Sequence, residues 1–279
     1  MNLNKAKVPK ELRAIIEDCN WKENTMGWSN AKVYFIENLK TGHNLYLKIL
    51  PCSVYNTIKD ENDILRWLKD KLPVSEVNYY NKYRNKEYLL TSEVLGVEIF
   101  ECDIEVGIKI FAKGLKTLHS INIFDCPFNQ TLNNRLAKAE INLKNIKAVG
   151  CGKRYNLIIK EAERLYEKLI EMKPNNEDLV FTHGDYTMAN VIVNNNEISG
   201  FIDVGDGGVA DRHNDIALAI ISIKYNSQPS DYDKNIKLFL EIYNYNEIDY
   251  SKIYYYTLLN EFFHLFSINS KFLALTYIS

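Results

Sequence analysis

The chain has 279 residues, of which 46% are hydrophobic and 25% are charged, and its formal net charge is −2. A chain of this length can bury one large core or two lobes, and the composition is that of a soluble globular protein. The near-neutral charge and a pI near 6.3 argue against a nucleic-acid or membrane-surface partner.

The cysteines and the apolar runs bear on the cellular compartment. Five cysteines, without a CxxC pair, predict reduced thiols rather than a disulfide framework or a zinc site. Residues 1–16 contain no continuous apolar segment, so we expect no secretory signal. No apolar run approaches the roughly 18 residues that a membrane span needs. These features together predict a cytoplasmic protein.

The first hundred residues alternate helical and strand-like patterns. Residues 9–19 are typical of a helix with Pro9 in its first turn, where the missing N–H costs nothing. Residues 23–37 indicate a turn that leads into an alternating strand, and 42–50 predict a second strand that pairs with it. Residues 56–71 predict a helix, and 88–100 begin as a strand that turns at Gly96.

The remainder of the chain is mainly helical in pattern. Helices are predicted over 103–121, 132–147 and 157–172, and again over 210–223 and 230–243. The change from mixed to nearly all-helical patterns puts a lobe boundary near residues 94–96. We therefore predict an N-terminal nucleotide-binding lobe of residues 1–94 and a C-terminal catalytic and substrate-binding lobe of residues 95–279.

Residues 181–205, FTHGDYTMANVIVNNNEISGFIDVG, carry the strongest functional signal. Asp185 is followed by Asn190, a short apolar strand, an Asn-rich turn, a second strand and Asp203. Phosphoryl transfer needs one carboxylate to orient a hydroxyl, and an amide and a second carboxylate to hold Mg²⁺. The alternative is a loop whose Asp and Asn only bond their own backbone. Because Asp203 ends an apolar strand, we expect it to be buried and to bind a cation.

Two charged residues stand on apolar faces in the first lobe. Lys48 shares a strand face with Tyr46 and Leu50, and Glu61 falls in the apolar stripe of the helix over 56–71. A buried charge is costly unless it is paired, so we expect an ion pair between Lys48 and Glu61. The alternative is a snorkelling lysine and a solvated glutamate.

Three further features carry weaker signals. Residues 25–31 lie between two strands, either as a phosphate-covering loop that uses Ser29 or as an ordinary hairpin turn. Asp211 is placed to cap the helix that follows it. Asp215 is placed to accept backbone N–H groups from the loop around Asp185. For both acids we favour a structural role.

These residues resemble the aminoglycoside O-phosphotransferases, particularly the 3′-phosphotransferases, which are small relatives of eukaryotic protein kinases. The resemblance runs through most of the chain and includes SNAKVYFI, LYLKI, DENDILRWLKDKLPV, LHSINIFDCPF, residues 180–217 and KIYYYTLLNEFF. It implies an α+β fold of the bilobal protein-kinase type, with a β-rich N-terminal lobe and a mainly helical C-terminal lobe.

The resemblance implies a nucleotide site in the first lobe. Lys48 and Glu61 are implied to position the phosphates, and Tyr46 to stack on adenine. The backbone at Ser92 and Val94 is implied to hydrogen-bond the adenine edge. ATP is the implied nucleotide, and the residues do not exclude GTP.

In the second lobe the resemblance implies Asp185 as the catalytic base, with Asn190 and Asp203 as Mg²⁺ ligands. The implied activity is transfer of the γ-phosphate to a hydroxyl of an aminoglycoside or a similar small molecule. The alternatives are a kinase of the same fold acting on another small alcohol, and a non-catalytic nucleotide-binding protein. The non-catalytic alternative is disfavoured because the residues needed for catalysis are all present: Lys48, Glu61, Asp185, Asn190 and Asp203. The residues do not fix the oligomeric state.

The substrate-binding part departs from the family pattern. Aminoglycosides are polycations, yet residues 132–154 contain six Lys or Arg residues and one acid, Glu140. Asn260 stands where the pattern has an acid, although Glu261 remains as a candidate substrate-binding residue. Asp206 replaces a usual Arg, and the chain continues past Phe263, where the 3′ enzymes end. We therefore expect weak binding of kanamycin-type substrates.

Overall fold

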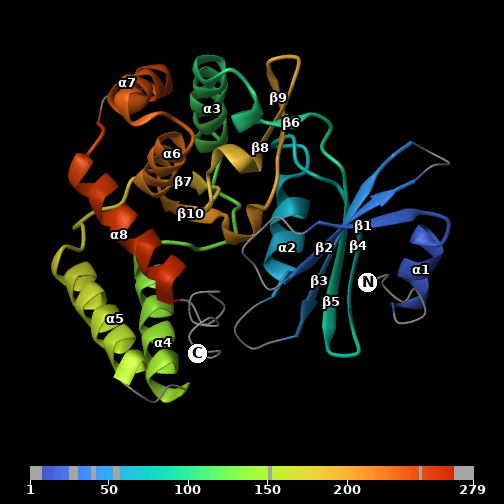
Figure 1. Ribbon diagram of the computed structural model, residues 1–279, viewed down its shortest axis with the longest axis horizontal. Coiled ribbons are helices and arrows are strands. Elements are labelled where there is room, and N and C mark those ends of the chain that lie inside the picture. Colours follow the sequence, from blue (N-terminus) through green and yellow to red (C-terminus); the bar gives the residue numbers. More distant parts are fainter. Residues whose placement is uncertain are drawn as a thin grey trace.

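The computed structural model describes residues 8–24, 31–38, 42–52, 57–149, 153–244 and 247–266. Its N-terminal part is built on one antiparallel sheet, in the strand order β1-β2-β3-β5-β4 (Figure 1). The strands are β1 (Asn20–Asn24), β2 (Lys32–Glu37), β3 (Leu45–Pro51), β4 (Val77–Tyr83) and β5 (Lys86–Ser92).

A helix covers each face of this sheet. On one face, α1 (Lys10–Ile16) packs against Leu45, Leu47 and Ile49 of β3. On the other, α2 (Lys59–Leu68) shares a core with Leu50 and Leu89, and it lies between the sheet and the helical part of the molecule (Figure 1). The predicted alternation of β3 is therefore confirmed, because its two faces enter two different cores.

The sequence patterns missed β4. This strand pairs with β5 through a two-residue turn in which Arg84 and Asn85 have φ values of 46° and 58°. Left-handed backbone at both turn residues suits the twist of a tight hairpin, and Asn adopts it at low cost. Asn85 between two Tyr-containing runs was the available signal. The predicted helix over 56–71 is shorter than expected, since α2 ends at Leu68.

The C-terminal part is mainly helical and carries two small sheets. Strands β8 and β9 form the predicted hairpin, with Asn195 and Asn196 in the left-handed turn. The helices are α3 (Ile104–His119), α4 (Leu132–Val149), α5 (Lys153–Glu171), α6 (His213–Tyr225), α7 (Tyr232–Tyr243) and α8 (Tyr250–Phe266). The strands are β6 (Val97–Glu98), β7 (Leu179–Thr182), β8 (Val191–Asn194), β9 (Glu197–Phe201) and β10 (Gly208–Asp211).

One hydrophobic core extends across the predicted lobe boundary. It includes Leu65 and Leu89 from the first part together with Phe181 from the second. The five-stranded sheet ends at Ser92, close to the predicted boundary, and the division at residue 94 stays a prediction. None of the helices in the described ranges is long and apolar enough to cross a membrane.

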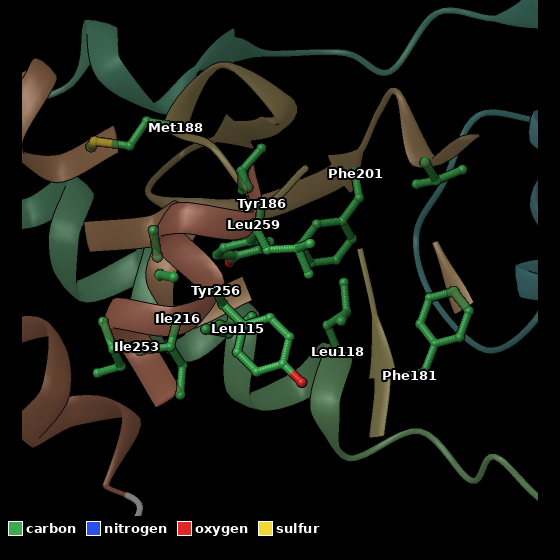
Figure 2. Close-up of a cluster of buried hydrophobic side chains, with 14 of the residues drawn as sticks. Leu115, Leu118, Phe181, Tyr186, Met188, Phe201, Ile216, Ile253, Tyr256 and Leu259 are labelled. Atoms are coloured by element: carbon green, nitrogen blue, oxygen red, sulfur yellow. The ribbon is translucent and has the colours of Figure 1, made fainter. Parts of the chain in front are cut away.

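Aromatic packing fixes the loop that follows β7 (Figure 2). Tyr186 is fully buried, stacks on Phe111 at 4.5 Å between ring centroids, and donates its hydroxyl to the Phe111 carbonyl at 2.7 Å. Met188 is also fully buried, and its N–H donates to the Ser222 hydroxyl at 2.8 Å. These two anchors point into the core, so the backbone on the C-terminal side of Asp185 is held rigidly.

Candidate active site

Three charged side chains meet where β3, α2 and the end of the β8–β9 hairpin converge. The Lys48 ammonium lies 2.7 Å from one Glu61 carboxylate oxygen and 2.9 Å from the other. It also lies 2.7 Å from Asp203 Oδ1. The predicted ion pair is confirmed. Burial opposes the charge on Lys48, but Glu61 and Asp203 outweigh it and raise the pKa of Lys48 above its usual range.

Asp203 differs from the expectation in its burial. Its side chain is 55% exposed, whereas the partners Lys48 and Glu61 are 19% and 12% exposed. The prediction of a buried Asp203 was wrong because the chain turns as the strand ends, with Asp203 in the left-handed region at φ 53°. That turn aims the carboxylate out of the core. Lys48 lowers the pKa of Asp203, so the carboxylate is ionised at neutral pH.

Asp185 and Asn190 contact each other directly. The Asn190 side-chain N–H₂ donates to the Asp185 carboxylate at 2.9 Å and to the Asp185 carbonyl at 2.8 Å. The backbone before Asp185 turns at Gly184, where φ is 83° and an added Cβ would lie 2.2 Å from the Asp206 carbonyl oxygen. Burial raises the pKa of Asp185, and the charges of Asp206 and Asp203 add to that effect.

The β8–β9 hairpin brings Asn190 and Asp203 to the same end of the site. Val191 pairs with Phe201 across the hairpin, and the Ile202 N–H donates to the Asn190 carbonyl at 3.1 Å. Because the Asn190 amide donates through its nitrogen, its side-chain oxygen is left as a donor atom for a metal. An amide oxygen and an exposed carboxylate are hard oxygen ligands, so this pair of residues fits Mg²⁺.

Asp215 of α6 holds the loop that leads into Asp185. One of its fully buried carboxylate oxygens accepts the His183 N–H at 2.7 Å, and the other accepts the Gly184 N–H at 3.0 Å. This confirms the structural role predicted for Asp215. Burial works against its charge, but hydrogen bonds from His119 and His183 outweigh burial and lower the pKa of Asp215.

The sequence interpretation missed the roles of two buried histidines. His183 lies 3.0 Å from the Ile202 carbonyl through Nε2, while its Nδ1 faces the Asp185 N–H at 3.3 Å. A carbonyl can only accept, so the Nε2 atom of His183 donates to the Ile202 carbonyl. His119 contacts Asp215 at 3.3 Å. Sequence spacing carried no signal for the contacts with Ile202 and Asp215, because these partners lie on other elements.

The residues predicted to contact adenine lie along β3 and after β5. Tyr46 is half-buried on the same face of β3 as Lys48, with its ring against Phe35. The Ser92 N–H donates to the Glu76 carbonyl at 2.9 Å, so that amide is already used within the sheet. In the part of the chain that the structure describes, the Val94 N–H has no backbone partner. Ser29 lies outside the described residues.

A cavity of about 450 Å³ opens beside Asp185. It lies between α4, α6, α8 and the loop after β7. Asn260 of α8 lines it, whereas Glu261 is exposed and is not among the lining residues that the structure describes. The lining residues are Gln130, Arg135, Lys138, Thr182, Gly184, Asp185, Asp206, Ala210, Asn214, Leu218, Asn260, Phe263 and His264. The side chains of Lys153 and Arg154 lie outside the described residues.

Comparison with known proteins agrees with this geometry. Residues 20–247 match the model of the phosphotransferase enzyme family. The chain is 35% identical over 271 residues to an aminoglycoside 3′-phosphotransferase of Niallia circulans, with 94% of this chain and 100% of the relative covered. This chain belongs to the phosphotransferase enzyme family.

Solved structures show the same fold. An aminoglycoside 3′-phosphotransferase of type VIII superposes with a TM-score of 0.76 at 26% identity, covering 91% of this chain and 97% of that one. An aminoglycoside phosphotransferase from Streptomyces rimosus, in complex with ADP and streptomycin, superposes with a TM-score of 0.70 at 20% identity, covering 90% and 95%. The predicted family resemblance and α+β kinase-like fold of this phosphotransferase are confirmed.

The cavity beside Asp185 has few acids. Of its lining residues only Asp185 and Asp206 are acidic, whereas Arg135 and Lys138 are basic. Arg135 contacts the side-chain oxygens of Asn214 and Asn260, the latter at 2.8 Å. The structure describes every Asp and Glu of the chain, and none lies within 4.0 Å of the Arg135 or Lys138 cations. Burial lowers the pKa of Arg135, but its charge persists at neutral pH.

Proposed function

We propose that this enzyme is an ATP- and Mg²⁺-dependent O-phosphotransferase that acts in the cytoplasm on a hydroxyl of an aminoglycoside or a similar small molecule. One observation carries the proposal. The Lys48–Glu61 pair contacts Asp203, and the hairpin that ends at Asp203 begins at the Asp185–Asn190 pair. Full-length similarity to an aminoglycoside 3′-phosphotransferase supports the same activity.

In this proposal each residue has one task. Asp185 accepts the proton of the attacking hydroxyl, and its raised pKa makes it a better base than an ordinary aspartate. Lys48, held by Glu61, binds the α- and β-phosphates. Asn190 and Asp203 hold Mg²⁺, which supplies positive charge to the phosphate oxygens when it is bound.

The nucleotide is proposed to lie between the sheet and the hairpin, in a lobe of residues 1–94. Tyr46 lies two residues before Lys48 on the same face of β3, and it is proposed to stack on adenine. The Val94 backbone and the Ser92 carbonyl are proposed to hydrogen-bond the adenine edge. Ser29 is proposed to contact the phosphates. A backbone N–H and a backbone carbonyl can also serve the O6 acceptor and N1–H donor of guanine if the base shifts, so both ATP and GTP belong in the assay.

Acceptor selectivity is proposed to differ from that of a broad aminoglycoside kinase. Each ammonium of an aminoglycoside gains about 1–3 kcal/mol from a carboxylate partner, and about 1.4 kcal/mol is tenfold in affinity. A cavity with two acids leaves most ammonium groups unpaired. Kanamycin-type substrates should then bind in roughly the high-micromolar to millimolar range.

The cavity also favours a second candidate function, phosphorylation of a less cationic small alcohol. Arg135 and Lys138 repel polycations and tolerate neutral or acidic groups on the acceptor. Glu261, on the exposed side of α8, contributes to the acceptor site only if the substrate extends beyond the cavity.

The deciding experiment is a coupled assay of ADP release. Purified enzyme is incubated with ATP or GTP, Mg²⁺, and a panel of aminoglycosides, other antibiotics and amino alcohols. Turnover with any hydroxyl acceptor, lost on chelation of Mg²⁺, supports the proposal. Tight nucleotide binding without turnover across the panel would instead favour a non-catalytic nucleotide-binding protein. Efficient turnover of many 3′-hydroxyl aminoglycosides would show that the basic cavity lining does not limit selectivity.

A further inference from the structure

A buried carboxylate stands at the beginning of α2, outside the machinery described above. Glu87 belongs to β5, and it is 1% exposed. Its carboxylate accepts the Ile58 N–H at 2.9 Å and the Thr57 hydroxyl at 2.7 Å. Lys82 of β4 places its ammonium 2.7 Å from the other oxygen. Burying a charge is costly unless it is paired, so these three partners stabilise the Glu87 carboxylate inside the core.

Near the start of helix α2, the Thr57 hydroxyl accepts the Lys59 N–H at 3.0 Å, whereas the Ile58 N–H takes its acceptor, Glu87, from another element. The residue before its first turn is Ile58, whose side chain accepts no hydrogen bond. The first N–H groups of a helix have no intrahelical acceptor and carry a partial positive charge. Glu87 supplies a negative acceptor from the neighbouring strand. Burial opposes its charge, but Lys82, Thr57 and Ile58 outweigh burial and lower the pKa of Glu87.

The Glu87 contact links β5, the strand next to Lys48, to α2, the helix that carries Glu61. Lys48 lies on β3, where it pairs with Leu89 of β5, two residues along from Glu87. Glu61 lies three residues after Ile58, in the first turn of α2. Strand β5 therefore holds the lysine strand on one side and, through Glu87, the start of the glutamate helix. Without this contact, the start of α2 would lose its polar attachment to β5, and the apolar packing of Ile64, Leu65 and Leu68 would remain.

We propose that Glu87 is a positioning residue for nucleotide binding: by fixing the start of α2 to β5, it holds Glu61 at the Lys48 ammonium. The inference rests on the proposed function in one respect, that Lys48 binds the nucleotide phosphates. Glu87 itself touches no phosphate. Its effect passes through α2, so it acts on the nucleotide and not on the acceptor.

Glu87→Gln is the direct test, and the chain offers a matched control. Glu177 also accepts the first N–H of a helix from another element, at 2.7 Å from Leu132 of α4, far from the sheet. Glu177→Gln therefore removes a partly buried carboxylate that accepts a helix N-terminal N–H away from the Lys48–Glu61 pair. Thermal unfolding of both variants measures the loss of stability, and calorimetric titration with ATP and Mg²⁺ measures nucleotide affinity.

We expect Glu87→Gln to weaken ATP binding about tenfold, as for loss of one charge-assisted hydrogen bond, and to leave the acceptor KM unchanged. Glu177→Gln should lower the unfolding temperature without changing nucleotide affinity. Thr57→Val should weaken nucleotide binding in the same direction as Glu87→Gln, and Thr57→Ser should retain wild-type affinity. Unchanged affinity in folded Glu87→Gln, or an equal loss in Glu177→Gln, would overturn the inference.

A second readout works without nucleotide. The acetylation rate of Lys48 by acetic anhydride, followed by mass spectrometry, reports how firmly Glu61 holds the ammonium. We expect faster acetylation in Glu87→Gln than in the wild type or Glu177→Gln. If wild-type protein binds no nucleotide, the proposed function fails while this labelling still tests Glu87. Equal labelling in all three proteins would overturn the positioning role.

Discussion

The two ends of the candidate active site differ in how their charged side chains are paired: the Lys48–Glu61–Asp203 cluster, which we propose as the nucleotide end, and the cavity beside Asp185, which we propose as the acceptor end. At the nucleotide end, Lys48 is paired with Glu61 and Asp203. At the acceptor end, Arg135 is held by the amide oxygens of Asn214 and Asn260. An ion pair fixes the position of a charge and offsets it. An amide fixes the position and leaves the charge largely uncompensated.

This difference separates what the fold prescribes from what selects the substrate. In our proposal, the paired cluster at the nucleotide end binds the phosphate chain, whatever the acceptor. The basic groups at the acceptor end act on each incoming molecule according to its own charge. Mutations at the two ends should therefore change different kinetic constants. Mutation of Asp211, a buried acid that belongs to neither end, should change only the free energy of unfolding.

The largest effect is expected from Asp185→Asn. Loss of a positioned base should lower kcat by roughly 10²–10⁴ and leave nucleotide affinity nearly intact. The coupled assay and calorimetric titration measure the two quantities on the same preparation, with circular dichroism as the check on folding. A variant with wild-type kcat would mean that Asp185 is not the base.

Asp211→Asn should lower the free energy of unfolding rather than kcat. The Asp211 carboxylate is fully buried, lies 2.9 Å from the buried Lys252 ammonium, and accepts the His213 N–H at the start of α6. Removing one partner of a buried pair costs about 3–5 kcal/mol, because Lys252 is left uncompensated. Chemical denaturation at pH 7 measures this loss, and kcat per folded molecule should change little.

The difference in stability between the wild type and Asp211→Asn should depend on pH. Hydrogen bonds from His213 and Lys252 outweigh burial and lower the pKa of Asp211 to about 2. A lowered pKa stabilises the folded state above the unfolded value, here near 4, and this contribution disappears as the pH falls towards 2. About 2 kcal/mol of the difference between wild type and Asp211→Asn should vanish in that window. A constant difference from pH 7 to pH 2 would contradict the assignment.

Lys48→Ala tests the nucleotide end alone. It should raise the KM for ATP by about tenfold or more, because one charge-assisted contact to phosphate is lost. The KM for the acceptor should stay within about twofold. Initial rates with each substrate varied in turn give both constants. A change confined to the acceptor KM would mean that Lys48 acts on the acceptor and not on the nucleotide.

Asn260→Asp tests the acceptor end and should give the smallest effect. A carboxylate beside Arg135 would offset its charge and offer an acceptor to an ammonium group, lowering the KM for kanamycin-type substrates by about three- to tenfold. Asn133→Asp is the control, since Asn133 is exposed on α4, the helix that carries Arg135, and already accepts a lysine ammonium. Equal effects of the two variants would argue for long-range attraction and against a local contact.

Several parts of the site could be predicted because their signals are local. Strand alternation put Lys48 opposite the face of Leu47, and helical spacing put Glu61 on the apolar stripe of α2. The spacing from Asp185 to Asn190 and the Asn-rich hairpin before Asp203 were visible in 25 consecutive residues. A buried charge needs a partner, so two misplaced charges on apolar faces predicted each other.

Other features depended on contacts between distant segments. Glu261 and Asn260 are adjacent in sequence, and only the packing of α8 decides that Asn260 faces the cavity. Arg135 meets Asn260 across 125 residues, and Glu87 meets Ile58 across 29. Periodicity assigns a residue to a face of its own element, which is a local property. Which faces then meet is decided by how the whole core packs, and that decision belongs to the tertiary structure.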